Sequence, residues 1–346
     1  MLEINNRQIE NNQPCYIVAD FSANHNQDYN TAAKLICTAK QCGADAVKFQ
    51  SYTPDTMTLN CTKPEFVIHE GTIWDGRTFY ELYSDTFMPF DWLPKLKKVA
   101  DDNNITFFST PFDKSSVDYL ESINIPVYKI ASYELIDIPL IEYVASKNKP
   151  VILSTGMANL QEIEEAVDAV QKFHNKLALL KCTSIYPALP NQMNLKSISY
   201  LSVAFGLPIG LSDHTPNIAV PIVAVSLGAC IIEKHMTLKR TKSGIDSSFS
   251  LEPDEFKNMV ESIRIAEDSF GEIRHKLTDV EYKSRNLRRS LFAVKDIKQG
   301  EVFTENNIKS IRPGYGLHPR YLNILIGQKA KRDLTFGTPL NQSDLG

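Results

Sequence analysis

The sequence predicts an α/β fold, a TIM (β/α)8 barrel that is followed by a small, mostly β domain. Eight short apolar segments alternate with amphipathic stretches over roughly the first 270 residues, as a closed barrel of strands and helices requires. The turn after the first segment, residues 21–25, contains no glycine, whereas an open doubly wound sheet would carry a glycine-rich phosphate turn there. The barrel is therefore favoured over the open sheet.

The predicted strands are mostly continuous apolar runs, the pattern of strands that are buried on both faces. They occupy residues 15–20, 45–49, 105–109, 127–130, 151–154, 177–182, 208–211 and 230–235. The clearest helical patterns lie between and after them, at residues 29–42, 94–103, 160–174, 218–227 and 253–270. This alternation accounts for the chain as far as Phe270.

The second strand is followed by an unusually long connection, residues 51–91, which is rich in aromatic residues. Loops of this length are uncommon unless they form a lid or a binding wall. In a barrel the connections that follow the strands make the active-site face. We expect this connection to be either a wall of the site or a structural insertion that packs on the side of the barrel.

The alternation stops after Phe270, and a different region follows. Residues 274–289 are rich in Arg and Lys and are predicted to form an exposed linker. Residues 293–308 align without gaps with residues 330–345, and the Ala, Asp, Gly and aliphatic positions coincide. Two copies of a strand, a Gly turn and a strand predict a small β domain with pseudo-two-fold symmetry. The predicted organisation is a barrel over 1–273, a linker over 274–289 and a small domain over 290–346.

Composition excludes several classes of protein. The chain has 43% hydrophobic and 23% charged residues, which is typical of a soluble globular protein. A net charge of -4 gives no electrostatic reason to expect nucleic acid, and no run approaches the ~18 apolar residues of a membrane span. The N-terminal segment lacks the apolar core of a signal peptide. The six cysteines include no CxxC pair, which indicates reduced thiols and a cytoplasmic enzyme.

Polar residues recur at the C-terminal ends of the predicted strands, where barrel enzymes place their active sites. Any one of them is compatible with a structural ion pair, but their recurrence indicates a site. Lysines and hydroxyls of this kind would hold a small phosphorylated anion, and no P-loop of a nucleoside triphosphatase is present. The polar residues at the strand ends include Asp20, Lys48, Gln50, Lys129, Ser132, Glu134, Ser154, Lys181, Ser184, Tyr186, Ser212, His214, Glu233 and His235.

Two histidines and one lysine suggest different chemistries. His214 and His235 end neighbouring strands, so their imidazoles would converge on a site that suits Mn²⁺, Co²⁺, Zn²⁺ or Fe²⁺. The alternative is that both are core histidines with satisfied hydrogen bonds. Lys181, near the end of the sixth strand, would form a Schiff base with a carbonyl substrate in an aldolase. Chelation and borohydride trapping distinguish the two chemistries.

Short motifs span the predicted barrel in a fixed order. They are Asn24-His25-Asn26, Ala44-Asp45-Ala46-Val47-Lys48-Phe49-Gln50, Lys129-Ile130-Ala131-Ser132, Ser154-Thr155-Gly156-Met157, Lys181-Cys182-Thr183-Ser184, Ser212-Asp213-His214-Thr215 and Glu233-Lys234-His235. With these motifs, and with Arg312-Pro313-Gly314 in the tail, the chain resembles the sialic acid synthase family. These are phosphoenolpyruvate-condensing TIM barrels with a C-terminal antifreeze-like (SAF) domain, so the resemblance implies that fold and that class of reaction.

Within this family the chain resembles the branch that makes pseudaminic acid, through residues 22–28, 52–56, 74–76, 80–83 and 246–253. Neuraminate synthases usually carry Glu where Asp20 stands, Gly where Tyr133 stands, and Pro-Asp-His near Asp246. The implied reaction condenses phosphoenolpyruvate with 2,4-diacetamido-2,4,6-trideoxy-L-altrose and water to give pseudaminic acid and phosphate. Synthesis of N-acetylneuraminic or legionaminic acid is the alternative, and a Schiff-base aldolase or an ice-binding tail is a remote one.

The resemblance also implies roles for single residues. His214 and His235 would hold a divalent metal (Mn²⁺, Mg²⁺ or Co²⁺), Glu134 would activate water or move protons, and Asp20 would contact the sugar. Arg312 would reach the site of a neighbouring subunit in a domain-swapped homodimer. Phosphoenolpyruvate is expected to contact Lys48, Thr110, Lys129, Ser132, Ser154, Ser184 and Ser212, and the sugar is expected to contact Asp20, Gln50, Tyr186, Asp246 and Arg312.

Overall fold

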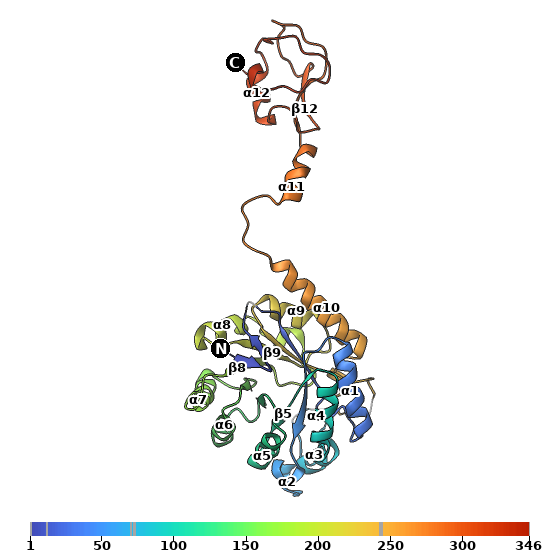
Figure 1. Ribbon diagram of the computed structural model, residues 1–346, viewed down its shortest axis with the longest axis vertical. Helices are drawn as coiled ribbons and strands as arrows, with labels where there is room; N and C mark the ends of the chain where they lie inside the picture. Colours follow the sequence, from blue (N-terminus) through green and yellow to red (C-terminus); the bar gives the residue numbers. More distant parts are fainter. Residues whose placement is uncertain (1, 12, 70, 72–73, 242–244, 346) are drawn as a thin grey trace. The chain divides into compact units, whose positions relative to one another are not determined.

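The computed structural model describes residues 2–11, 13–69, 71, 74–241 and 245–345 (Figure 1). In this part of the chain eight parallel strands close into a barrel in the order β10-β3-β4-β5-β6-β7-β8-β9. The predicted TIM barrel is therefore confirmed. The strands are β3 Tyr16–Asp20, β4 Ala46–Ser51, β5 Thr106–Pro111, β6 Tyr128–Ile130, β7 Val151–Ser154, β8 Leu177–Cys182, β9 Ile209–Asp213 and β10 Ile231–His235.

Helices surround the strands on the outside of the barrel (Figure 1). They are α1 Tyr29–Gln41, α2 Pro54–Met57, α3 Phe79–Thr86, α4 Trp92–Asp102, α5 Lys114–Ser122, α6 Ile138–Ala145, α7 Leu160–Gln171, α8 Ser197–Phe205, α9 Ala219–Ser226 and α10 Pro253–Phe270. The sequence sets several of their starts, because the side chains of Asp28, Asp113 and Asn159 accept hydrogen bonds from the first backbone N–H groups of α1, α5 and α7.

The period of two along each strand divides the barrel into an inner and an outer layer. Val18, Phe108 and Leu180 belong to the apolar cluster inside the barrel, while their chain neighbours Ile17, Phe107 and Leu179 belong to the larger cluster between strands and helices. The inner cluster also contains Leu2, Ile4 and Ile9 of an N-terminal antiparallel hairpin, β1 Leu2–Ile4 and β2 Arg7–Ile9. The same alternation sends every second residue at the C-terminal strand ends into the barrel.

The second connection of the barrel, residues 51–91, includes the helices α2 and α3. Thr53 begins α2 and Thr78 begins α3, each with a side chain that accepts from the N–H group three residues later and a reciprocal bond from that residue's side chain. This capping box satisfies N–H groups that a helix otherwise leaves unpaired. The capped helices α2 and α3 of this connection are thus able to present side chains in fixed positions.

The chain divides into two compact units, Met1–Gly271 and Glu272–Gly346. The second unit begins with exposed residues that include α11 Asp279–Ser284, and it continues with β11 Ser290–Ala293, β12 Ile308–Ile311 and α12 Leu322–Leu325. Strands β11 and β12 pair in antiparallel fashion. Its own apolar cluster includes Leu291, Ile297, Phe303, Leu334 and Leu340.

Hydrogen bonds within the second unit reproduce the repeat seen in the sequence. Ile297 and Leu334, which are equivalent in the two copies, exchange N–H···O=C bonds of 2.8 Å in both directions. The Gly300 N–H donates to the Ala330 carbonyl, and the equivalent Gly337 N–H donates to the Ala293 carbonyl, each at 2.8 Å. Residues that are equivalent by a shift of 37 positions thus make equivalent bonds, which is the pseudo-two-fold symmetry that the alignment predicts.

Among the described residues, no helix combines the length and the apolar character that a crossing of a membrane requires.

Candidate active site

A cavity of about 440 Å³ opens at the C-terminal ends of the barrel strands. Most of the side chains that the sequence assigns to a site line it: alternation points those on the strands inward, and the others follow in the connections after the strands. These predicted residues are Asp20, Lys48, Gln50, Lys129, Ser132, Glu134, Ser154, Tyr186, Ser212, His214, His235 and Asp246.

The floor of the cavity is a buried charge network centred on Lys48. Its Nζ lies 2.9 Å from Asp20 Oδ2 and 3.6 Å from Glu233 Oε1. Glu233 Oε1 also accepts a 3.0 Å hydrogen bond from Ser212 Oγ. Burial opposes the charged forms, but the neighbouring lysine keeps the pKa of Asp20 below its usual value, and Asp20 and Glu233 keep the pKa of Lys48 above its usual value. The charge of Lys48 is therefore largely compensated within the protein.

Lys129 is a second buried lysine of the cavity, and its surroundings differ. Only 1% of the residue is exposed, and its Nζ donates to Ser154 Oγ at 2.6 Å and to the Ile130 carbonyl at 2.8 Å. No ion pair between residues in the described ranges includes Lys129. Burial lowers the pKa of this lysine. A buried ammonium without a carboxylate in contact is costly, so this position favours the arrival of an anion.

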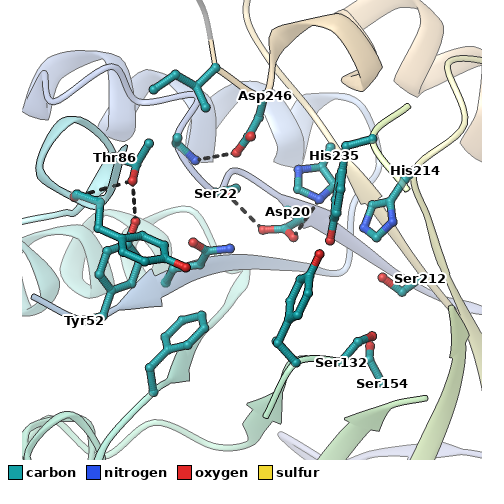
Figure 2. A pocket seen from close by; sticks show the side chains of 18 of the residues that line it. Asp20, Ser22, Tyr52, Thr86, Ser132, Ser154, Ser212, His214, His235 and Asp246 are labelled. Carbon is teal, nitrogen blue, oxygen red and sulfur yellow. Dashed lines mark hydrogen bonds and ion pairs between the residues drawn. The ribbon is translucent and has the colours of Figure 1, made fainter. Parts of the chain in front are cut away.

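Serine hydroxyls surround a glycine beside Lys129. The Gly156 N–H donates to Ser132 Oγ at 3.1 Å. A Cβ at Gly156 would lie only 2.2 Å from Ser184 Oγ and 2.7 Å from Ser132 Oγ, so only glycine lets both hydroxyls approach this backbone. Figure 2 shows Ser132 and Ser154 next to each other, on the side of the cavity away from Asp246. Lys129 and these hydroxyls form a polar end that suits an anionic group.

The two histidines lie side by side, with ring centroids 5.3 Å apart. His214 Nδ1 lies 2.9 Å from the Thr183 carbonyl oxygen, which fixes Nδ1 as the protonated nitrogen and leaves Nε2 as an acceptor. His235 Nε2 lies 3.3 Å from Asp20 Oδ2, and its buried Nδ1 has no hydrogen-bond partner among the described residues. Burial lowers the pKa of His235, which keeps its imidazole neutral.

This pair of imidazoles fits a divalent metal. An unpartnered, buried and neutral imidazole nitrogen beside a second imidazole is a donor set for ions such as Mn²⁺ or Co²⁺. Three or more His, Cys, Asp or Glu side chains do not gather as a ligand cluster anywhere in the described ranges. Two protein ligands leave the other coordination positions to water and substrate, which suits a catalytic rather than a structural ion.

Glu134 stands at the edge of the cavity, and its environment gives it an unusual acidity. Its Oε2 is buried and has no hydrogen-bond partner among the described residues. Burial raises the pKa of Glu134 to about 7. A carboxyl group with a pKa near neutrality is able both to accept and to release a proton under physiological conditions. It is the group of this cavity best suited to general acid–base work.

Aromatic residues and Asp246 form the side of the cavity next to the histidines. The Ala23 N–H donates to Asp246 Oδ2 at 3.1 Å, which fixes this carboxylate beside the end of β3. Tyr186 packs on His214, with ring centroids 4.3 Å apart, and on Trp74 at 5.9 Å. Asp246 and Tyr186 therefore face the space next to the histidines.

Three predicted residues do not line the cavity. Thr110 is fully buried, and its Oγ1 has no hydrogen-bond partner among the described residues. Ser184 approaches Gly156 but is absent from the lining. Arg312 belongs to the second unit. Lys181, the candidate Schiff-base lysine, is also absent from the lining: it alternates with inward-facing Cys182, and its Nζ bonds to Thr183 Oγ1 and the Cys182 carbonyl. The aldolase interpretation loses its support for this reason.

Sequence reasoning gave no role to several residues that line the cavity. Glu233 is among the polar strand ends that the sequence indicates, but without a role; it shares an inward face with His235 because of the period of two along β10. The 51–91 connection supplies a wall with Tyr52, Trp74 and Tyr83. Of the two interpretations of this connection, the binding wall therefore agrees with the structure.

The chain is similar to known proteins over nearly its whole length. The sequence profile of the NeuB family matches residues 35–275, and that of the SAF domain matches residues 288–346. Pseudaminic acid synthase of Campylobacter jejuni is 43% identical over 330 residues, 95% of this chain and 96% of that protein. N,N'-diacetyllegionaminic acid synthase of Legionella pneumophila is 38% identical over 347 residues, 97% of each.

A solved structure shows the same architecture. The crystal structure of N-acetylneuraminic acid synthetase from Leptospira borgpetersenii, in complex with citrate, superposes with a TM-score of 0.73 and 33% sequence identity. The superposition covers 82% of this chain and 94% of that chain.

Proposed function

The chain belongs to the NeuB family, and on this premise we propose that it is a pseudaminic acid synthase, a transferase that forms a C–C bond. The proposed reaction joins phosphoenolpyruvate, 2,4-diacetamido-2,4,6-trideoxy-L-altrose and water to give pseudaminic acid and phosphate. The similarity to curated pseudaminic acid synthases, at 43% identity over 95% of the chain, supports this choice of sugar. One observation carries the claim for an anionic substrate: Lys129 is buried at the cavity, and its hydrogen-bond partners among the described residues are neutral.

Phosphoenolpyruvate binds at the polar end of the cavity in this proposal. Lys129, Ser132 and Ser154 contact its phosphate and carboxylate, while the charge of Lys48 on the floor is held by Asp20 and Glu233. Charge-assisted hydrogen bonds of this kind are the strong ones. The neutral sugar occupies the rest of the cavity, toward Asp246 and Tyr186, with its aldehyde carbon next to C3 of phosphoenolpyruvate.

The first step is attack of C3 of phosphoenolpyruvate on the aldehyde carbon. The new C–C bond takes the electron pair of the C2–C3 double bond, the aldehyde oxygen becomes a hydroxyl after protonation, and C2 gains oxocarbenium character. Buried carboxylates near C2, such as Asp20 and Glu233, stabilise developing positive charge. Water then adds to C2, and its proton passes to Glu134, whose pKa of about 7 suits this transfer. The tetrahedral intermediate collapses with cleavage of the C2–O bond and release of phosphate.

His214 and His235 would hold a divalent metal, Mn²⁺, Mg²⁺ or Co²⁺, on the sugar side of the cavity. When bound, such an ion supplies Lewis acidity that orients and polarises the aldehyde oxygen. Asp20, close to His235 Nε2 at 3.3 Å, orients this imidazole and fixes its tautomer, as second carboxylates commonly do for ligating histidines. Asp20 thus contacts both Lys48 on the floor and His235 of the histidine pair.

The proposal extends to assembly and location. Arg312 lies in the second unit, next to Pro313 and Gly314, and in a domain-swapped homodimer it would complete the sugar site of the partner subunit. The composition and the reduced cysteines agree with a cytoplasmic enzyme. A measurement of molecular mass in solution tests the dimer. The activity of an R312A variant tests whether Arg312 contributes to the site.

Release of phosphate from phosphoenolpyruvate tests the proposed reaction. The acceptors are 2,4-diacetamido-2,4,6-trideoxy-L-altrose, N-acetylmannosamine and the diacetamido sugar of the legionaminic acid series, each with and without Mn²⁺. We expect release with the first acceptor in the presence of the metal. Preference for either of the other sugars would assign the chain to the neuraminate or legionaminate branch, and no release with any of them would overturn the proposal.

A further inference from the structure

The two ends of the cavity differ in chemistry. Ser132, Ser154 and Ser212 lie on one side, and Tyr52 and Thr86 lie across the cavity from them (Figure 2). The serine side also contains Lys129, whereas the opposite side is formed by the 51–91 connection. A ligand that spans the cavity therefore meets cationic and hydroxyl groups at one end and a different surface at the other.

That different surface is an apolar wall, by which we mean the side chains of Met57, Ile68, Phe79 and Leu82. All four line the cavity, and Ile68 and Leu82 are only 3% and 8% exposed. Phe79 and Leu82 come from α3, which starts at a capping box. Ile68 is held by backbone hydrogen bonds of 2.9 Å, from its N–H to the Arg77 carbonyl and from the Gly76 N–H to its carbonyl. The wall is therefore a fixed surface.

Two hydroxyl groups next to the apolar wall, those of Tyr52 and Thr86, are bonded within the protein. Tyr52 Oη lies 2.7 Å from Thr86 Oγ1, and Thr86 Oγ1 donates to the Leu82 carbonyl at 2.9 Å. The Tyr52 hydroxyl therefore donates its hydrogen bond to Thr86 Oγ1. A hydroxyl of a ligand pressed against this wall would lose water without a good replacement, while a methyl group would gain contact.

The direction of the acceptor sugar follows from the reaction. This step rests on the proposed function: the aldehyde carbon, C1, must lie against phosphoenolpyruvate at the polar end. C6 is the carbon farthest along the open chain from C1, so it extends away from Lys129 and Ser154. The far side of the cavity is the apolar wall, and C6 of the proposed acceptor is a methyl group.

We propose that the apolar wall receives the C6 methyl group and makes the enzyme selective for 6-deoxy acceptor sugars. A hydroxyl on C6 would then be buried against Ile68, Phe79 and Leu82. An apolar pocket rejects an added hydroxyl by roughly 10–100-fold in kcat/KM. The wild-type protein should show a preference of about this size for the 6-deoxy sugar over its 6-hydroxy counterpart.

The test compares kcat/KM for two acceptors, 2,4-diacetamido-2,4,6-trideoxy-L-altrose and 2,4-diacetamido-2,4-dideoxy-L-altrose, in the wild type and in two wall variants. L82N places an amide of similar size in the wall, and F79Y adds one hydroxyl with little risk to folding. L59N is the matched control, because Leu59 lies in the same connection, is 65% exposed and does not line the cavity. Thermal melting verifies that each variant is folded.

We expect L82N and F79Y to lower the 6-deoxy preference by about 10-fold, with an unchanged KM for phosphoenolpyruvate, and L59N to leave it unchanged. If folded L82N and F79Y keep the wild-type preference for the 6-deoxy sugar, or if the wild type has no such preference, the role of the apolar wall is overturned. The proposed function is not affected by either result. Absence of turnover with both sugars would instead mean that the proposed function itself is wrong.

Discussion

Two buried lysines of this barrel should differ in how far substitution by methionine lowers the free energy of unfolding. Lys129 is 1% exposed and Lys234 is 0% exposed. Lys234 Nζ lies 2.5 Å from Asp213 Oδ2 and also bonds to the Thr215 carbonyl. Within the part of the chain that the structure describes, Lys129 Nζ bonds to the neutral oxygens of Ser154 and Ile130. We therefore expect Lys234 to stabilise the fold and Lys129 to bind a substrate.

The expected magnitudes follow from these contacts. K234M leaves the buried Asp213 carboxylate without its partner and should cost about 3–5 kcal/mol of unfolding free energy. K129M removes a buried charge that no carboxylate contacts, so the free energy of unfolding should change by no more than about 1 kcal/mol. The same K129M change removes a charge-assisted contact with phosphoenolpyruvate worth about 1.5–3 kcal/mol. That loss raises the KM for phosphoenolpyruvate by about 10–150-fold.

Thermal melting of both variants and steady-state kinetics of K129M measure these effects. The melting temperature of K234M should fall by roughly 2–4 °C per kcal/mol lost, while that of K129M stays close to the wild-type value. A K129M variant that is destabilised as much as K234M, with an unaltered KM for phosphoenolpyruvate, would refute the assignment of Lys129 to anion binding.

Three further predictions concern other parts of the cavity. Because the folded-state pKa of Glu134 is raised from 4.5 to about 7, its contribution of about 3 kcal/mol to stability is complete below pH 4.5 and is lost as the pH rises through about 7. E134Q should therefore show a smaller loss of melting temperature between pH 5 and pH 8 than the wild type, and identical losses would contradict the shift. H214A and H235A should each lose metal-dependent turnover and tight Mn²⁺ binding by calorimetry, whereas full turnover of either variant in a chelator would remove the metal from the mechanism. G156A should raise the KM for phosphoenolpyruvate about 10-fold, since its Cβ would meet two serine hydroxyls at 2.2 and 2.7 Å; an unchanged KM would show that those hydroxyls do not bind this substrate.

The barrel and most of its cavity were predictable because two periodicities act together. Apolar runs between helical patterns identify the strands, and the alternation of side chains assigns an inward direction to residues such as Lys48, Lys129 and His235. The same rule, applied strictly, would have turned Lys181 outward and Glu233 inward. A motif match does not carry this directional information, since Lys234 and His235 are neighbours in one motif and face opposite sides of β10.

The apolar wall was not predictable in the same way. Met57, Ile68 and Phe79 lie in a connection without a long periodic pattern, and their common surface depends on how α2 and α3 fold back over the barrel. The sequence indicated only that this connection is long and aromatic. Arg312 illustrates another limit, because its role depends on a second subunit, which no pattern within one chain describes.

Identification of the product tests the central claim most directly. Purified protein, phosphoenolpyruvate, Mn²⁺ and 2,4-diacetamido-2,4,6-trideoxy-L-altrose are incubated together, and the products are analysed by mass spectrometry and NMR spectroscopy. Formation of pseudaminic acid and phosphate in equal amounts is the predicted result. A complete reaction mixture that yields no nine-carbon acid, from a protein shown to be folded, would contradict it.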